Sequence, residues 1–185
     1  ALTPEQQGVI PPAGATGLRY AAMGYTMAVE PAMLPSNARQ AHLEMADIPI
    51  IDRGAYAMLG NDDFLLRLML KKRNHRAVAD YVGTMMAATR ALGVKVVNPG
   101  GISAFKFNKR RLELDEQGPF YDQTPRAVLH TLARALDTLG VPHPLHVHCS
   151  NLGIPGNVDT TLGTIRAAEG LPVHLTHLQF HSYGA

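Results

Sequence analysis

The sequence predicts an α/β protein built on a parallel β-sheet. Short apolar segments alternate along the chain with segments that carry apolar residues at helical spacing, and proline and glycine separate them. Strands that alternate with helices pair in parallel through right-handed crossovers. The 185 residues are 46% hydrophobic, which is enough for a buried core, and no repeat or linker divides them. We therefore expect residues 1–185 to belong to a single domain.

The first elements are weakly marked. Residues 1–18 contain several prolines and glycines, and they predict an irregular segment. Residues 24–29 are short and apolar and predict a strand, which Pro31 closes. Ser36 is a suitable N-cap for a helix over 36–45, and residues 49–52 predict a second, short buried strand.

The middle of the chain is better marked. Asn61 and Asp62 can cap one helix, and Asn74 can cap a longer one, with Gly93 expected just beyond its C-terminus. Residues 94–97 follow as a strand, and a Pro-Gly-Gly sequence stops it. A long polar loop is expected from there to residue 123.

The last third holds the clearest helix, which begins at Thr124-Pro125 and ends at Gly140. A strand over 145–149, a helix over 157–168 and a final strand over 173–180 follow. About five strands are therefore expected. An eight-stranded barrel typically needs about 250 residues, whereas an open doubly wound sheet needs a glycine-rich turn after its first strand, and that turn is missing.

Composition excludes several classes of protein. A formal charge of +2 with scattered basic residues gives no nucleic-acid footprint. Charged residues interrupt every apolar run, so no membrane span is expected. The single cysteine, Cys149, excludes an intramolecular disulfide framework and fits a reducing compartment, so we expect a cytoplasmic protein. Cys149 itself is interpreted as a packed apolar thiol.

Histidines gather near the ends of the last two predicted strands. His146 and His148 alternate along one strand and therefore share a face, whereas His174 and His177 have opposite parity, so only one of them can face a common site within a regular strand. Each histidine alone is most simply a hydrogen-bonded structural group. Histidines near the carboxyl ends of two successive parallel strands instead favour a metal site, because neutral imidazole is a common zinc ligand.

Lys95 is unusual because it interrupts the apolar strand 94–97. An ammonium group is costly to bury without a partner. Lys95 could lie at the strand edge with its head in water. Alternatively, its amine could add carbon dioxide and form a carbamate, an anionic ligand that can bridge two metal ions.

Together these motifs resemble the A subunits of formylmethanofuran dehydrogenase and of its bacterial relative, the formyltransferase/hydrolase complex. The resemblance covers nearly the whole chain and rests on motifs at 94–101 (VKVVNPGG), 146–157 (HVHCSNLGIPGN) and 174–184 (HLTHLQFHSYG), with 23–26 (MGYT), 30–31 (EP) and 47–52 (DIPIID) before them.

The resemblance implies a metal-dependent amidohydrolase with a distorted (β/α)8 TIM-like barrel, of which residues 1–185 would form roughly strands 2 to 6. It places the ligands of a two-zinc site on Lys95 (as carbamate), His148 and His177. The expected catalytic aspartate and the first His-x-His pair match nothing in this sequence, so this portion alone is expected to be inactive. Residues just beyond the ligand positions are candidates for substrate binding: Asn151, Gln179 and His181.

The implied reaction is hydrolysis of the N-formyl group of formylmethanofuran, or of its methylofuran counterpart, to formate, or the reverse condensation. The resemblance implies zinc as the cofactor and the furan carrier as the substrate. It implies the other subunits of the complex as protein partners. Two alternatives stay open. One is an amidohydrolase acting on a cyclic amide, as dihydroorotase and hydantoinase do, and the other is a scaffold subunit without catalysis.

Overall fold

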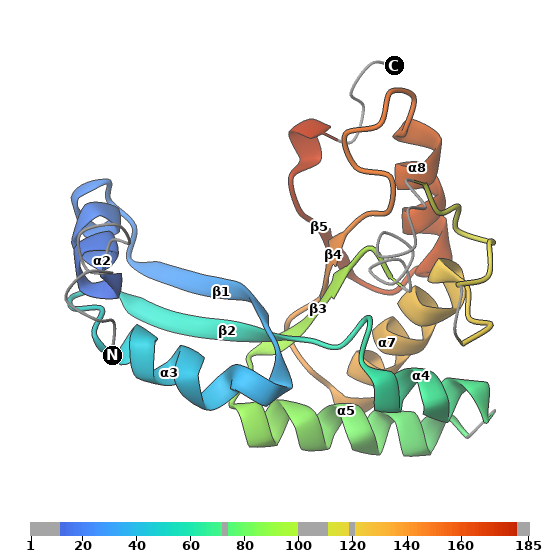
Figure 1. Cartoon of the computed structure of the whole chain (residues 1–185), viewed down its shortest axis with the longest axis horizontal. Helices are drawn as coiled ribbons and strands as arrows, with labels where there is room; N and C mark the ends of the chain where they lie inside the picture. Colours follow the sequence, from blue (N-terminus) through green and yellow to red (C-terminus); the bar gives the residue numbers. More distant parts are fainter. Residues whose placement is uncertain (1–11, 72–73, 100–110, 119–120, 181–185) are drawn as a thin grey trace.

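The computed structural model describes residues 12–71, 74–99, 111–118 and 121–180. Five parallel strands form one sheet, and their order in the sheet follows their order in the chain (Figure 1). The strands are β1 (Met27–Met33), β2 (Asp52–Met58), β3 (Gly93–Val97), β4 (Leu145–His148) and β5 (Val173–Leu175). The predicted α/β class with a parallel sheet is therefore confirmed.

Helices connect the strands. They are α2 (Ala13–Ala22), α3 (Ala38–Ala46), α4 (Asp63–Leu70), α5 (His75–Thr89), α7 (Pro125–Leu139) and α8 (Val158–Ala167), with short 3-10 helices η1 (Pro35–Asn37) and η2 (Leu178–Phe180). Three predicted N-caps are confirmed, because the side chains of Asp62, Asn74 and Thr124 each accept a hydrogen bond from a backbone N–H in the first turn. Such caps typically contribute about 1 kcal/mol each.

Several predicted boundaries near the N-terminus are wrong. Helix α2 begins at Ala13, within the segment predicted to be irregular, of which residues 1–11 lie outside the described residues. Strand β1 runs through Pro31 instead of ending before it, and its pairing with β2 is irregular between Glu30 and Met33. Proline is tolerated there because β1 is an edge strand of the described sheet. The strand predicted over 49–52 is placed too early, because β2 begins at Asp52 and runs to Met58.

The end of α5 also differs from the prediction. Arg90, with φ 53°, takes the left-handed position that closes the helix, and Gly93 instead opens β3. The reason for a glycine at position 93 is steric: a Cβ there would lie 3.1 Å from the Tyr56 ring and 3.2 Å from the His143 Cβ. Gly140, with φ 64°, closes α7 as predicted.

The apolar core lies between the sheet and its helices. Val94, Val96 and Val147 are fully buried and belong to one cluster with residues of α4, α5, α7 and α8. Because side chains alternate along a strand, their neighbours Lys95, His146 and His148 point to the opposite face. Figure 1 shows α4, α5, α7 and α8 on one side of β3 and β4. The sheet therefore has an apolar face against helices and a second face that carries polar groups.

The described strand order contains no reversal of direction, which an open doubly wound sheet would have. Closure into a barrel stays a prediction. No helix among the described residues is both long and apolar enough to cross a lipid bilayer.

Candidate functional site

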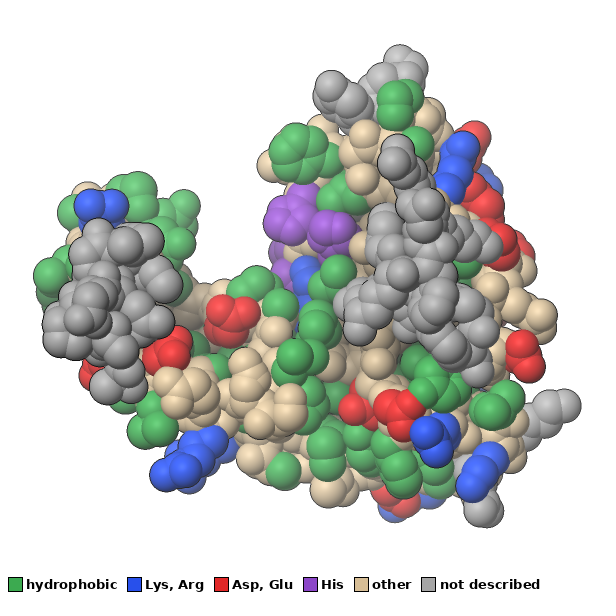
Figure 2. Space-filling model, viewed as in Figure 1, with side chains coloured by type: hydrophobic (Ala, Val, Ile, Leu, Met, Phe, Trp, Pro, Cys, Tyr) green, Lys and Arg blue, Asp and Glu red, His purple; other side chains and the backbone are tan. Residues whose placement is uncertain are grey.

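A row of polar side chains crosses the second face of the sheet. Lys95 on β3 is in register with His146 on β4, which is in register with His174 on β5. Partners in register on neighbouring strands point to the same face. Figure 2 shows histidine side chains gathered in one patch beside the hollow of the molecule, with a basic side chain next to them. This patch lies where Figure 1 places β4 and β5.

Lys95 is buried, with 3% of its surface exposed, and both of its hydrogen-bond partners among the described residues are uncharged. Its Nζ lies 2.9 Å from Nδ1 of His146 and 3.2 Å from Oγ1 of Thr176. Burial lowers the pKa of Lys95 to about 8, and the nearby Cys149 thiol only partly opposes that shift. The head of Lys95 therefore does not reach water at a strand edge, and the interpretation as a solvated edge lysine is wrong.

His146 links Lys95 to the other histidines. Its ring stacks on His174 at a centroid distance of 4.6 Å and lies 4.9 Å from the ring of Tyr56. Burial, with smaller contributions from the positive charges of Lys95, His174 and His177, lowers the pKa of His146 to about 4. His146 is therefore neutral near pH 7. Sequence reasoning left it out of the candidate site, although its alternation with His148 already placed it on the same face.

His148 and His177 lie together at the carboxyl end of the sheet. Their rings meet edge to face, with centroids 5.3 Å apart. Strand β5 ends at Leu175, so the prediction of a regular strand over 173–180 is wrong. The chain turns at His177, which has φ 55°, and the parity argument that separated His174 from His177 does not apply beyond Leu175.

The three candidate substrate-binding residues differ in their surroundings. Asn151 is buried, and its Oδ1 accepts a hydrogen bond of 3.0 Å from the backbone N–H of Leu112. Gln179 is exposed in η2, two residues beyond His177. His181 lies outside the described residues. Substrate binding by these residues stays a prediction, and Asn151 also has a structural role.

Cys149 points into the core. It is 1% exposed, belongs to the apolar cluster between the sheet and the helices, and has its pKa raised to about 11 by burial. A hydrogen bond with Thr164 and the nearby Lys95 oppose that rise without cancelling it. The interpretation of Cys149 as a packed thiol is confirmed.

The candidate ligands His148, His177 and Lys95 fit a zinc site only if they act together or with further ligands. His148 and His177 supply two adjacent imidazoles, and the lowered pKa of Lys95 makes a neutral amine available for conversion to a carbamate. Within residues 12–71, 74–99, 111–118 and 121–180, no three His, Cys, Asp or Glu side chains are grouped so that they could hold a metal ion. A metal site on this face therefore requires Lys95 or ligands from outside these residues.

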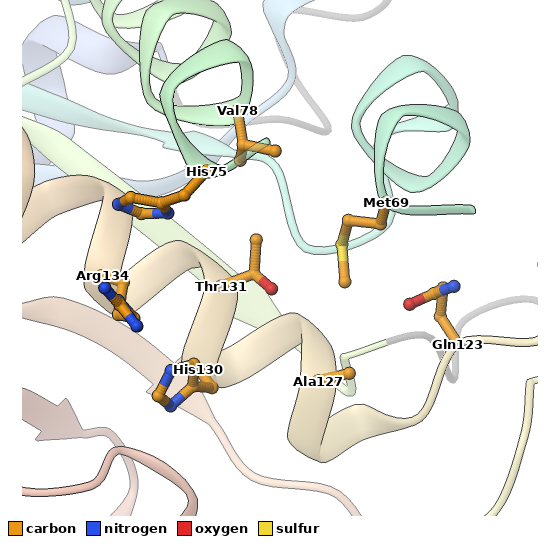
Figure 3. Close-up of a pocket in the computed structure, with 8 residues that line it drawn as sticks. All are labelled: Met69, His75, Val78, Gln123, Ala127, His130, Thr131 and Arg134. Carbon is orange, nitrogen blue, oxygen red and sulfur yellow. The ribbon is translucent and has the colours of Figure 1, made fainter. Parts of the chain in front are cut away.

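A separate pocket of about 270 Å3 lies among α4, α5 and α7. Figure 3 shows Met69 from α4, His75 from α5 and Arg134 from α7 among the side chains that line it. The helices α4, α5 and α7 cover the apolar face of the sheet. None of the candidate site residues lines this pocket.

The comparisons with known proteins support the resemblance. No family model matches the chain. The chain is 52% identical over 168 residues to the A subunit of the formyltransferase/hydrolase complex Fhc of Methylorubrum extorquens, covering 91% of this chain and 31% of that protein. It is 39% identical over 186 residues to protein FwdA of Methanocaldococcus jannaschii, covering 95% of this chain and 33% of that protein.

A solved structure is also similar. The crystal structure of the FhcABCD complex from Methylorubrum extorquens with methylofuran contains a chain that matches with a TM-score of 0.89 and 51% identity, over 92% of this chain and 32% of that one. The present chain thus spans about a third of the length of the curated relatives it matches. The resemblance that the sequence motifs predicted is confirmed: this chain is a homologue of the Fhc A subunit and of FwdA over about a third of their length.

Proposed function

We propose that this chain forms part of an A-type subunit of a formyltransferase/hydrolase complex and carries part of its hydrolytic site. The observation that carries the proposal is Lys95, which is buried among uncharged partners on the polar face of the sheet, next to a group of histidines. A buried lysine without an opposite charge is costly. Conversion of the amine to an anionic metal ligand would remove that unpaired positive charge.

The proposed ligands are Lys95 as carbamate, His148 and His177. A carbamate forms from the neutral amine, and a pKa of about 8 leaves about half of the amine neutral at pH 8. Bound zinc would polarise the formyl oxygen and lower the pKa of a water molecule to about 7. His148 and His177 would offer ring nitrogens from the carboxyl end of the sheet, which is where barrel enzymes build their active sites.

The arrangement also implies how the whole protein is built. The five strands follow one another in the sheet without reversal, as the strands of a (β/α)8 barrel do. We propose that strands from elsewhere in the full-length protein close this barrel and add the remaining ligands and the catalytic aspartate. The side chain of Gln179, exposed beyond His177, is then placed to contact substrate.

The proposed substrate is the N-formyl derivative of a furan-type carrier, hydrolysed to formate and amine or formed in reverse. The solved complex with methylofuran supports this choice, because a chain of that complex is 51% identical to this one. The other members of that type of complex are the proposed partners.

The test uses the full-length protein with Lys95→Ala or His148→Ala. We expect both variants to lose zinc and to release formate from the formylated carrier at least about 100-fold more slowly than the parent, a loss typical of removing a metal ligand or its support. Lys71→Ala, at an exposed position, is the matched control and should keep both properties.

Three results would contradict the proposal. Unchanged formate release and zinc content in Lys95→Ala would favour a scaffold subunit. Ring opening of a hydantoin by the parent protein, without release of formate from the formylated carrier, would favour a cyclic-amide hydrolase. A variant that loses zinc but keeps its activity would show that hydrolysis does not require the metal.

A further inference from the structure

Two side chains, Thr176 and His146, lie within hydrogen-bond distance of the amine of Lys95. We propose that Thr176 and His146 are positioning residues that orient the neutral amine of Lys95 for addition of carbon dioxide. This inference rests on the proposed function, because it concerns how the carbamate ligand is made. The evidence is the hydrogen-bond geometry around Nζ.

The hydroxyl of Thr176 has a fixed polarity. Its Oγ1 lies 3.0 Å from the carbonyl oxygen of Val147, and a carbonyl can only accept, so the single hydroxyl proton is used in that bond. Oγ1 therefore accepts the hydrogen bond from Nζ of Lys95, which lies 3.2 Å away. The amine must donate an N–H to Thr176.

His146 makes the second contact, at 2.9 Å from its Nδ1 to Nζ of Lys95. A neutral imidazole that carries its proton on Nε2 presents a lone pair at Nδ1. Tyr56 and His174 pack against the ring of His146 and hold its orientation. The amine then donates its second N–H to Nδ1.

A neutral primary amine has two N–H bonds and one lone pair. With one N–H directed to Thr176 and the other to His146, the remaining tetrahedral direction at Nζ is that of the lone pair. This lone pair attacks the carbon of CO2, an N–C bond forms, and one C–O π pair moves onto oxygen. The nitrogen then loses one of its two protons to solvent through the hydrogen bond with Nδ1 of His146, which leaves a carbamate with one negative charge and one N–H.

The experiment measures carbamate formation directly in the full-length, metal-free protein. Lys95 is decarboxylated at mildly acidic pH, and 13C-labelled bicarbonate is added at pH 8 while 13C NMR follows the carbamate carbon. We expect Thr176→Val to slow the labelling by about threefold to tenfold, as loss of one oriented hydrogen bond would. Thr176→Ser keeps the hydroxyl and is expected to restore the rate.

His146 gives a second, independent pair of variants. His146→Leu removes the acceptor and should slow labelling, whereas His146→Asn offers an amide oxygen in its place and should recover part of the rate. This pair decides the matter if Thr176→Val does not fold, which circular dichroism would reveal. Zinc uptake after labelling should fall in the same order as the labelling rate.

The outcomes distinguish the inference from the function on which it rests. If the parent protein never shows a carbamate signal at Lys95, Lys95 is not a carbamate ligand and that part of the proposed function is wrong. A parent protein that is labelled, with Thr176→Val and His146→Leu labelled at the same rate, overturns the positioning role and leaves the proposed function intact. Equal rates for Thr176→Ser and Thr176→Val, both slower than the parent, would also overturn the assigned role of the hydroxyl.

Discussion

The rings of His148 and His177 meet edge to face with centroids 5.3 Å apart, although only His148 belongs to a strand. His177 reaches this position through a turn with φ 55° after β5 has ended. A non-glycine residue in the left-handed region is uncommon and is often found at functional sites. The pairing of these two candidate ligands therefore depends on one local backbone conformation.

Lys95 should make stability depend on pH in the alkaline range. Its pKa is about 8 in the folded chain and 10.5 when unperturbed. Between these values the unfolded state binds more protons than the folded state, so this residue makes the free energy of unfolding rise with pH from about 8 to 10.5. Urea unfolding of metal-free, decarboxylated full-length protein at several pH values measures this.

The matched variant is Lys95→Met, which removes the titrating group and keeps an apolar stem of similar length. The parent loses stability as pH falls from 10.5 toward 8, and Lys95→Met should not lose this contribution. The free energy of unfolding of Lys95→Met should therefore rise relative to that of the parent over this range. Lys71→Met, at an exposed position, should show no such trend. Parallel pH profiles for Lys95→Met and the parent would contradict the assigned burial of the amine.

His146 should act in the acidic range with the same sign. The pKa of His146 is about 4 in the folded chain and 6.5 when unperturbed. Between these pH values His146 is protonated in the unfolded state and neutral in the folded state. Stability is then lost as pH falls from about 6.5 to 4. The free energy of unfolding of His146→Asn, measured over this range in metal-free protein, should fall less steeply than that of the parent, and an equal slope would count against burial of a neutral ring.

Asn151 should contribute to stability whether or not it contacts substrate. Its buried Oδ1 accepts from the Leu112 N–H, and its backbone has φ 60°. Asn151→Ala should lower the free energy of unfolding, measured by urea denaturation, by about 1–3 kcal/mol, because it leaves that N–H unsatisfied. Asn151→Gly loses the same bond but tolerates the left-handed conformation, so it should be more stable than Asn151→Ala by about 1 kcal/mol. Equal stability of the parent and Asn151→Ala would count against the structural role.

The thiol of Cys149 should be inert in the native protein. It is 1% exposed and its pKa is raised to about 11, so little thiolate is present below pH 9. Treatment with a thiol reagent at pH 8, followed by peptide mass spectrometry, should find Cys149 unmodified until denaturant is added. Fast modification in the native state would show that the core opens readily between the sheet and the helices.

Sequence reasoning performs best where local chemistry decides. The caps at Asp62, Asn74 and Thr124 act through side chains within the first turn, so residue type and spacing were sufficient to place those helices. Strand β2 was misplaced because two of its four apolar residues are small alanines, which give a weak strand signal, while the prolyl segment before it is more hydrophobic. In that case pairing with β1 and β3 outweighed local preference.

The candidate site was predictable in composition but not in contacts. Alternation along 145–148 placed His146 and His148 on one face, and Lys95 was visible as a charge within an apolar strand. The register that brings Lys95 opposite His146 could not be predicted, because pairing between strands is a tertiary property. Thr176 was missed for the same reason: its contact with Lys95 reaches from the end of β5 across β4 to β3.

The consecutive order of the sheet leaves β1 and β5 at its two margins within the described residues. Outer strands present backbone N–H and C=O groups that can template the addition of another chain. A polypeptide limited to these 185 residues should therefore self-associate through strand addition, whereas co-expression with the segments that flank it in the longer homologues should keep it dispersed.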